Sequence, residues 1–332
     1  MTLTRRHFLP LFGSAMVFPP ALAAEQGERL PVVAVLTGNV ASDTDAERRV
    51  RAFREALPRL GWIENQNYRL EVRWPGPVLA SQEVCARELV ALEPKVILVT
   101  NTAAARTLQR LTQAIPIVFV GLSDPVATGL VSSVARPSGN ITGFALYEHS
   151  FSGKWLSLLK RLAPHLKEVI VLFNPETSPY AAFYIQAALE MGSKLFVSVK
   201  AVPVRDPDQI DPAILGTGAS GNAGLIILPD GGFVSSNSAK IISAAAKHRV
   251  PTIFAVKNYV MRGGLMSYGP DLTAQFRDGA GYVDRILRGT RPSELPVQFA
   301  TKFNLAINAK AADELGLPIP ETLSLDAELI DD

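Results

Sequence analysis

The chain has 332 residues, with 33 Lys plus Arg, 31 Asp plus Glu and a single cysteine. This length is enough for two lobes of ordinary size, whereas the near balance and the scatter of the charges argue against nucleic acid or an anionic membrane as the partner. The lone Cys85 excludes an intrachain disulfide, and its place in a predicted amphipathic helix is typical of a buried structural thiol.

The first 23 residues have the pattern of an export signal. Two arginines lie in the segment from Thr4 to Leu9, an apolar stretch interrupted by Pro10 and Gly13 runs from Phe8 to Phe18, and small residues occupy Ala21 and Ala23. This order predicts a twin-arginine signal peptide over residues 1–23, cleaved near Ala23, and a periplasmic location. The alternative is an N-terminal anchor or an unstructured tail. Removing the two leader arginines from the 33 basic residues leaves 31, against 31 acidic ones.

Strands and helices alternate along the rest of the chain, which predicts parallel sheets with helices on both faces. Strands are expected at 30–36, 68–74, 95–100, 115–121, 168–173, 194–202, 225–228 and 251–256. Helices are expected at 43–60, 81–92, 103–112, 179–191, 207–215 and 235–248. The pattern of strand 96–99, helix and strand 115–120 recurs at 225–228 and 250–255, so the two halves share one design.

The elements after the second half, at 265–268, 271–288, 296–300 and 303–307, are too few for a third domain. They are explained if the chain crosses back to the first lobe and returns. We therefore expect an α/β fold of two doubly wound parallel-sheet lobes joined by three hinge crossings, near 141–146, 267–270 and 294–298. The predicted N-terminal lobe is 30–143 plus 268–294, and the predicted C-terminal lobe is 144–267 plus 295–325.

The buried strand at 115–121 runs directly into Ser123, Asp124 and Pro125. A strand of this kind ends at the carboxyl edge of its sheet, where open α/β folds bind ligands. Asp124 and Pro125 are also typical of the N-cap and first residue of a helix.

Polar residues follow several other predicted strands, so we expect two polar rims that face each other across a cleft. Amides and hydroxyls at a helix start hold a carboxylate, and an aspartate such as Asp124 or Asp230 holds an ammonium group. Each of these residues alone is also explained as a helix cap or a turn former. The candidate ligand-binding residues are Thr37, Asn39, Thr100, Asn101, Thr102, Ser123, Asp124, Asn174, Asp230, Lys257 and Tyr268.

The sequence offers no catalytic or cofactor site. The glycines from Gly216 to Gly221 have the spacing of a dinucleotide-binding loop, but they precede a strand instead of following one, which is typical of a surface loop. The histidines lie in separate segments without other metal ligands at suitable spacing, and no G-x-S-x-G motif occurs. We therefore expect no metal, no cofactor and no enzymatic activity.

Several longer stretches resemble the substrate-binding proteins of ABC transporters, in the tryptophan/tyrosine-type branch. The resemblance covers essentially all of the chain after the leader. Two departures lie on the expected second-lobe wall, at 231–233 and 257–259. The stretches that carry the resemblance are 115–144, GGLMSYGPD at 263–271, ARPSGNITG at 135–143, GYVDRILRG at 281–289, LPV at 295–297 and TKFNLAIN at 301–308.

The resemblance implies a type I periplasmic-binding-protein fold that closes on a small polar ligand, such as an amino acid, and delivers it to the membrane permease of an ABC importer. By the same resemblance Ser123, Asp124, Asp230 and the segment 100–102 line the cleft. A monomer is expected for a two-lobe clamp. Two other functions stay open at this point: the ligand-binding subunit of a membrane sensor, and a secreted α/β oxidoreductase.

Overall fold

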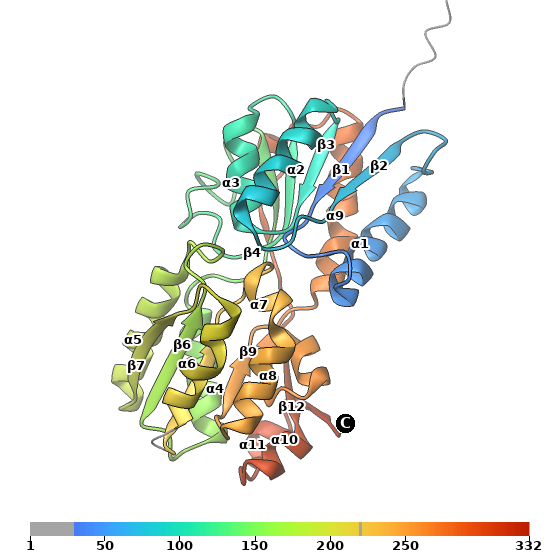
Figure 1. The fold of residues 1–332 in the computed structure, drawn as a ribbon. Helices are drawn as coiled ribbons and strands as arrows, with labels where there is room; N and C mark the ends of the chain where they lie inside the picture. The colour runs from blue at the N-terminus through green and yellow to red at the C-terminus, as the bar shows by residue number, and fades with distance from the viewer. Residues whose placement is uncertain (1–29, 219–220, 332) are drawn as a thin grey trace, which may run out of the picture.

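The computed structural model describes residues 30–218 and 221–331 and contains two α/β lobes, one above the other in Figure 1. The predicted signal peptide lies outside the described residues. The expected fold, with two mainly parallel sheets covered by helices, is confirmed. Within the described ranges no helix is both long and apolar enough to span a membrane.

The first sheet has six parallel strands in the order β11-β5-β4-β3-β1-β2. Side chains alternate along β1, so Val33 and Val35 face α1 and α9, whereas Ala34 and Leu36 face α2 and α3. The strands are β1 (Val32–Leu36), β2 (Arg69–Arg73), β3 (Val96–Val99), β4 (Ile117–Leu122), β5 (Ile141–Ala145) and β11 (Gln298–Phe299). The helices are α1 (Thr44–Ala56) with the 3-10 turn Leu57–Leu60, α2 (Leu79–Ala91), α3 (Thr102–Leu111) and α9 (Leu272–Leu287), followed by the 3-10 turn Pro292–Glu294.

The second sheet has seven strands in the order β13-β12-β10-β9-β8-β6-β7, and only the β10–β12 pair is antiparallel. The strands are β6 (Glu168–Phe173), β7 (Ser198–Pro203), β8 (Ala223–Ile227), β9 (Thr252–Phe254), β10 (Met266–Gly269), β12 (Asn304–Asn308) and β13 (Ala327–Ile330). The helices are α4 (Phe151–Leu162), α5 (Ala181–Leu195), α6 (Ile210–Gly218), α7 (Phe233–Ser236), α8 (Ser238–Lys247), α10 (Ala309–Glu314) and α11 (Glu321–Ser324), with 3-10 turns at Pro207–Gln209 and Lys257–Arg262.

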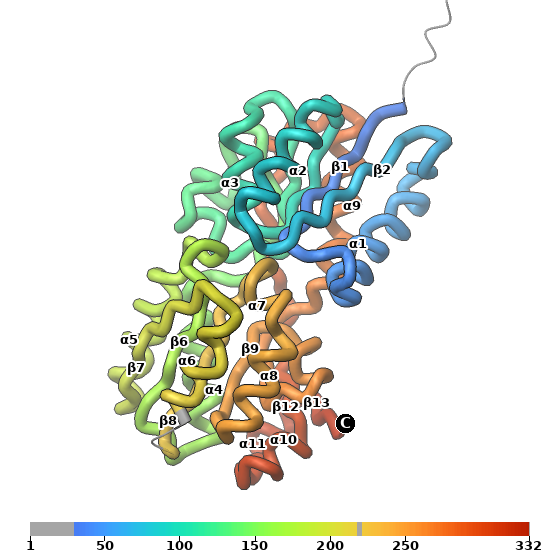
Figure 2. The backbone as a smooth tube through the Cα atoms, viewed as in Figure 1, coloured from blue at the N-terminus to red at the C-terminus, as the bar shows by residue number. Residues whose placement is uncertain are grey.

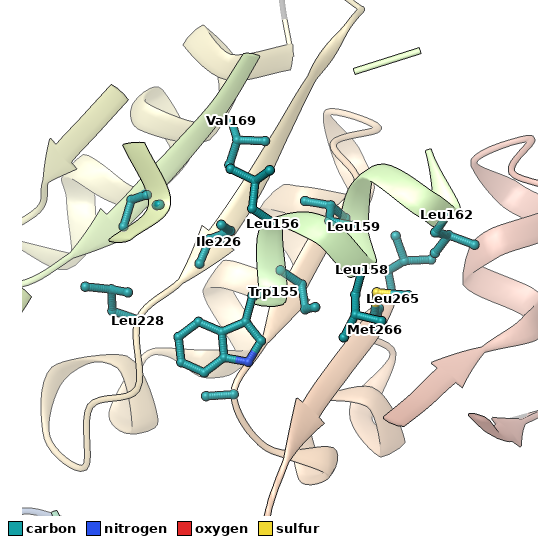
Figure 3. Packing of buried hydrophobic residues seen from close by; sticks show 14 of the residues in the cluster. Trp155, Leu156, Leu158, Leu159, Leu162, Val169, Ile226, Leu228, Leu265 and Met266 are labelled. Carbon is teal, nitrogen blue, oxygen red and sulfur yellow. The ribbon is translucent and has the colours of Figure 1, made fainter. Parts of the chain in front are cut away.

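The largest core lies beneath α4 in the second lobe. Helix α4 buries Trp155, Leu156 and Leu159 against side chains of the central strands, such as Ile226 on β8 and Met266 on β10 (Figure 3). The indole Nε1 of Trp155 donates a hydrogen bond of 2.8 Å to the carbonyl of Tyr268. This bond satisfies the one polar atom of a side chain that is otherwise surrounded by apolar neighbours.

The chain passes between the two sheets three times, between β5 and α4, between β10 and α9, and between β11 and β12. Figure 2 shows the orange α9 segment in the upper lobe, although β10 before it and β12, which follows β11, belong to the lower lobe. Strand β11 pairs with β5 through Phe299, so the last passage lies at residues 300–303. The exact lobe boundaries stay a prediction.

The structure corrects four local expectations. Pro125 does not begin a helix, because residues 125–130 form turns after Asp124, whose φ is 45°. Helix α5 extends through Lys194 and Leu195, so strand β7 begins later than expected. The helix expected at 235–248 is interrupted at Asn237 between α7 and α8. The glycine-rich segment is not all loop, since 216–218 end α6, and residues 219–220 lie outside the described ranges.

Candidate ligand-binding site

A cavity lies between the lobes, at the carboxyl ends of both sets of parallel strands. The space between the lobes, with the open solvent at its mouth included, is about 760 Å³. The polar lining residues of the first lobe are Thr37, Asn39, Arg49, Thr100, Asn101, Thr102 and Ser123. Those of the second lobe are Thr177, Tyr180, Asp230, Ser235 and Tyr259.

Seven of the eleven candidate residues line this cavity, which brings together strand ends from both lobes. They are Thr37, Asn39, Thr100, Asn101, Thr102, Ser123 and Asp230. The other four, which are Asp124, Asn174, Lys257 and Tyr268, are not among the lining residues. The role of any of the eleven in binding stays a prediction.

Each of the four outlying residues has a partner elsewhere. The Asp124 carboxylate accepts hydrogen bonds from the backbone N–H of His149 (3.1 Å) and lies 2.6 Å from its Nδ1. Asn174 accepts from two backbone N–H groups of the following turn. Lys257 pairs with Glu328 at 2.5 Å, and the Tyr268 ring stacks within the hinge.

Three hydrogen-bond donors on the first-lobe wall have no partner in the described chain. Asn101 is the N-cap of α3, and its Oδ1 accepts from the N–H of Ala104 at 2.8 Å. This bond leaves the Nδ2 group of Asn101 buried and unpaired. Within the described chain, the Thr100 hydroxyl and the Nε of Arg49 are also buried without a hydrogen-bond partner. Unpaired buried donors are costly, so three of them around one cavity indicate that a ligand with acceptor atoms completes the wall.

The second-lobe wall carries a buried carboxylate, Asp230, which is 7% exposed. It accepts hydrogen bonds from the Thr177 hydroxyl (2.5 Å) and from the N–H groups of Gly232 (2.7 Å) and Val234 (3.4 Å). Burial raises the pKa of Asp230, although these donors oppose the rise. The site therefore holds an acidic group that a cationic partner would stabilise.

The two lobes touch directly at one side of the cavity. The Nδ2 group of Asn39 donates to Asp43 (2.8 Å) and to the hydroxyl of Ser235 in the second lobe (2.9 Å). The Ser235 hydroxyl in turn donates to Asp43 Oδ2 at 2.9 Å. We call these three residues the interlobe latch. Because hydrogen bonds join the lobes, the structure is that of a closed state.

Two glycines allow this close approach. A Cβ atom on Gly38 would lie 2.9 Å from the carbonyl oxygen of Gly231 in the other lobe. A Cβ on Gly231 would lie 3.1 Å from the carbonyl oxygen of Thr100. Side chains at these positions would hold the lobes further apart, so glycine at both permits the observed closure.

Aromatic rings connect the three passages between the lobes. One aromatic residue lies at each passage: Tyr147 at the first, Tyr268 at the second and Phe303 at the third. The centroid of the Phe303 ring is 6.4 Å from that of Tyr147 and 5.9 Å from that of Tyr268. Phe151 packs against Phe303 at 4.6 Å. The Tyr147 hydroxyl also donates a hydrogen bond to the carbonyl of Ala255. We call this group the hinge cluster.

Sequence reasoning missed Arg49, Tyr180, Ser235 and Tyr259 among the lining residues. A signal for Arg49 is present, because it lies at helical spacing from Ala46 and Phe53 on the buried face of α1. A charged residue on an apolar helix face indicates a polar partner. The other three belong to loops or short helices whose position the sequence pattern does not define.

The protein has two α/β lobes that are joined by three passages of the chain and that enclose a polar cavity at the carboxyl edges of their sheets. This arrangement defines the class of type I periplasmic binding proteins. The family described as ABC transporter substrate binding protein matches residues 39–330. The chain therefore belongs to this family, and it is a solute-binding component of an ABC importer. The family is described as one of substrate-binding proteins.

Individual relatives agree with this assignment. A conserved domain protein of Vibrio cholerae has a TM-score of 0.83 and is 26% identical, covering 91% of this chain and 99% of that one. A domain from Streptococcus pneumoniae in complex with L-Trp has a TM-score of 0.80 at 20% identity, with the same coverage. The tyrosine-binding protein of Clostridioides difficile is 21% identical over 262 residues, 79% of this chain and 74% of that protein.

Proposed function

We propose that this protein binds an amino acid or a similar small polar solute in the cavity and delivers it to a membrane permease. The observation that carries the proposal is the pair of opposed polar walls, with unpaired donors in the first lobe and the buried Asp230 in the second. The names of two relatives, one in complex with L-Trp and one a tyrosine-binding protein, support an amino acid as the ligand.

The mechanism follows from the position of the cavity. A ligand that touches both walls gains its full set of contacts only when the lobes are closed, so binding shifts the equilibrium from open to closed. The permease then distinguishes the loaded protein by a surface that both lobes form together. We propose that the seven cavity-lining candidates contact the ligand and that Asp124, Asn174, Lys257 and Tyr268 support the fold.

The remaining features belong to the same proposal. The leader over residues 1–23 is a twin-arginine signal, cleaved near Ala23, and the mature chain works in the periplasm as a monomer. Its predicted lobes, 30–143 plus 268–294 and 144–267 plus 295–325, are adjusted so that β5 and β11 belong to the first lobe and β10 and β13 to the second.

Native mass spectrometry of protein purified without refolding tests the proposal. We expect one small molecule to remain bound. Unfolding in denaturant, dialysis and refolding would remove it, and we expect the radius of gyration measured by X-ray scattering to increase as a result. Returning the solute would restore the smaller radius. A protein that carries no solute and whose dimensions do not respond to a library of amino acids and related metabolites would contradict the proposal.

A further inference from the structure

The cavity has one cationic and one acidic side chain among its described lining residues, and they belong to different lobes. Arg49 extends from α1 in the first lobe, and Asp230 follows β8 in the second. The remaining polar lining residues are neutral. One unit of each charge on opposite walls complements a ligand that carries a negative and a positive group at separate ends.

Arg49 differs from its neighbours on α1. Arg48 pairs with Asp45 at 2.6 Å, Arg51 with Glu47 at 3.7 Å and Arg54 with Glu64 at 2.9 Å. In the described chain Arg49 pairs with no carboxylate, and its buried Nε has no hydrogen-bond partner. Asp45 and Glu47 in the first turn of α1 are thus engaged by other arginines, and Asp43 caps the helix and accepts from Asn39 and Ser235, so the Arg49 guanidinium is left for an occupant of the cavity.

The surroundings hold the Arg49 guanidinium toward the cleft. Its central carbon lies 6.0 Å from the centre of the Phe276 ring, within the range of a cation–π contact. Its positive charge also reaches the second lobe, where it opposes the effect of burial on Tyr259, whose pKa is raised to about 12. A side chain that packs on an aromatic ring beside the cavity is oriented before any ligand arrives.

Two neutral donors accompany Arg49 on the same wall, the Thr100 hydroxyl and the Nδ2 group of Asn101, both buried and unpaired. A guanidinium flanked by neutral donors matches a carboxylate, which accepts several hydrogen bonds and carries one charge. A dianionic phosphate would instead leave one charge uncompensated.

We infer that Arg49 is the anchor for the ligand's carboxylate and makes a free carboxylate a requirement for binding. This inference rests on the proposed function, because it assigns a specificity-determining role within the same cavity. Arg49, Thr100 and Asn101 hold the carboxylate from the first lobe, and Asp230 faces the ligand's ammonium group from the second.

Arg49→Gln tests the inference, with Arg51→Gln as the matched control on the same helix, because Arg51 pairs on the surface with Glu47. A thermal-shift screen of all common amino acids would first identify any ligand better than L-tyrosine and L-tryptophan. Calorimetry would then compare each free amino acid with its amide, such as tyrosinamide or tryptophanamide, which lacks the carboxylate charge. We expect wild type and Arg51→Gln to prefer the free acid. We expect Arg49→Gln to lose about 10- to 100-fold in affinity for the acid and to bind acid and amide equally. Arg49→Lys would restore part of the preference.

An unchanged thermal midpoint would show that Arg49→Gln is folded, as expected for a side chain that forms no ion pair with any residue in the described chain. Retention of the acid preference in folded Arg49→Gln would overturn the inference. The inference would also be overturned if the wild-type protein bound no free amino acid but carried a solute without a carboxylate. In that case the proposed solute-binding function would still hold. Absence of any solute or response would instead contradict the proposed function itself.

Discussion

At the scale of single residues, Asp230 is a carboxyl group whose ionisation is opposed by its burial in the fold. It is almost fully buried, and burial raises its pKa above the ordinary 3.8. The folded ligand-free protein therefore binds the Asp230 proton more tightly than the unfolded chain does. It follows that Asp230 lowers the free energy of unfolding as the pH rises from about 4 through its folded pKa.

Asp230→Asn removes this ionisation and keeps the shape of the side chain. We expect the thermal midpoint of ligand-free Asp230→Asn to rise relative to wild type as the pH is increased from about 4, and the difference to level off above the folded pKa. Thermal unfolding followed by circular dichroism over this pH range measures the difference. A difference that is constant or that shrinks with rising pH would contradict the raised pKa. Ligand affinity at neutral pH is expected to fall about 10-fold or more.

At the scale of elements, α9 completes the core of the first lobe. Phe276, Ala280 and Val283 pack with residues of α1 and the sheet, such as Phe53. The helix lies so close to β4 that a Cβ on Gly279 would be 2.9 Å from a methyl group of Val120. Glycine at this position therefore serves packing and not backbone freedom.

Gly279→Val is expected to lower the free energy of unfolding by about 1–3 kcal/mol, because the added atoms overlap Val120. Gly281→Val is the matched control on the same helix, since a Cβ there meets no atom within 4 Å. We expect the control to lie within about 0.5 kcal/mol of wild type. Urea denaturation gives both values, and equal effects of the two substitutions would contradict the close packing of α9 on β4.

At the scale of the whole molecule, the interlobe latch determines how stable the closed state is. Asp43 uses Oδ1 to cap α1 and Oδ2 to accept from Asn39 and Ser235. Asp43 itself is not among the residues that line the cavity. Changing it therefore alters closure without removing a ligand contact.

Asp43→Ser keeps a side-chain oxygen for the helix cap but removes the second acceptor. We expect ligand affinity to fall about 10-fold, mainly through faster dissociation, because a hydrogen bond to a charged group contributes about 1.5–3 kcal/mol. Stopped-flow measurement of dissociation tests this, with Asp206→Ser as the control, since Asp206 caps a 3-10 turn of the second lobe. Equal rates for Asp43→Ser and wild type would show that the latch does not stabilise closure.

The sequence was sufficient for the fold where apolar runs were bounded by clear caps. Strand β6 has the predicted bounds, and Asn101 caps α3 from within the predicted polar group. Helix α4, at Phe151–Leu162, was not predicted, although its buried residues recur at helical spacing, because no side-chain cap marks its start. Strand β13 was missed because it is partly exposed at the sheet edge, where alternation is weak.

For the site, strand ends located the cavity but not every side chain in it. Asp124 follows β4 as expected, yet a left-handed backbone and the bond to His149 direct its carboxylate elsewhere. Arg49 enters the cavity from a helix face, which an argument based on strand ends does not examine. The lining residues that the sequence pattern did not identify are therefore placed in the cavity by the tertiary packing of loops and helices.

The late position of α9 in the chain has a consequence for biosynthesis. When a ribosome has made the first 270 residues, every strand of the second lobe except β12 and β13 exists, but α1 still exposes the apolar face that α9 later covers. The nascent first lobe therefore keeps this apolar surface uncovered until the last fifth of the polypeptide emerges. A stop codon anywhere before α9 would leave both lobes incomplete, because α9 and β11 complete the first lobe and β12 and β13 complete the second.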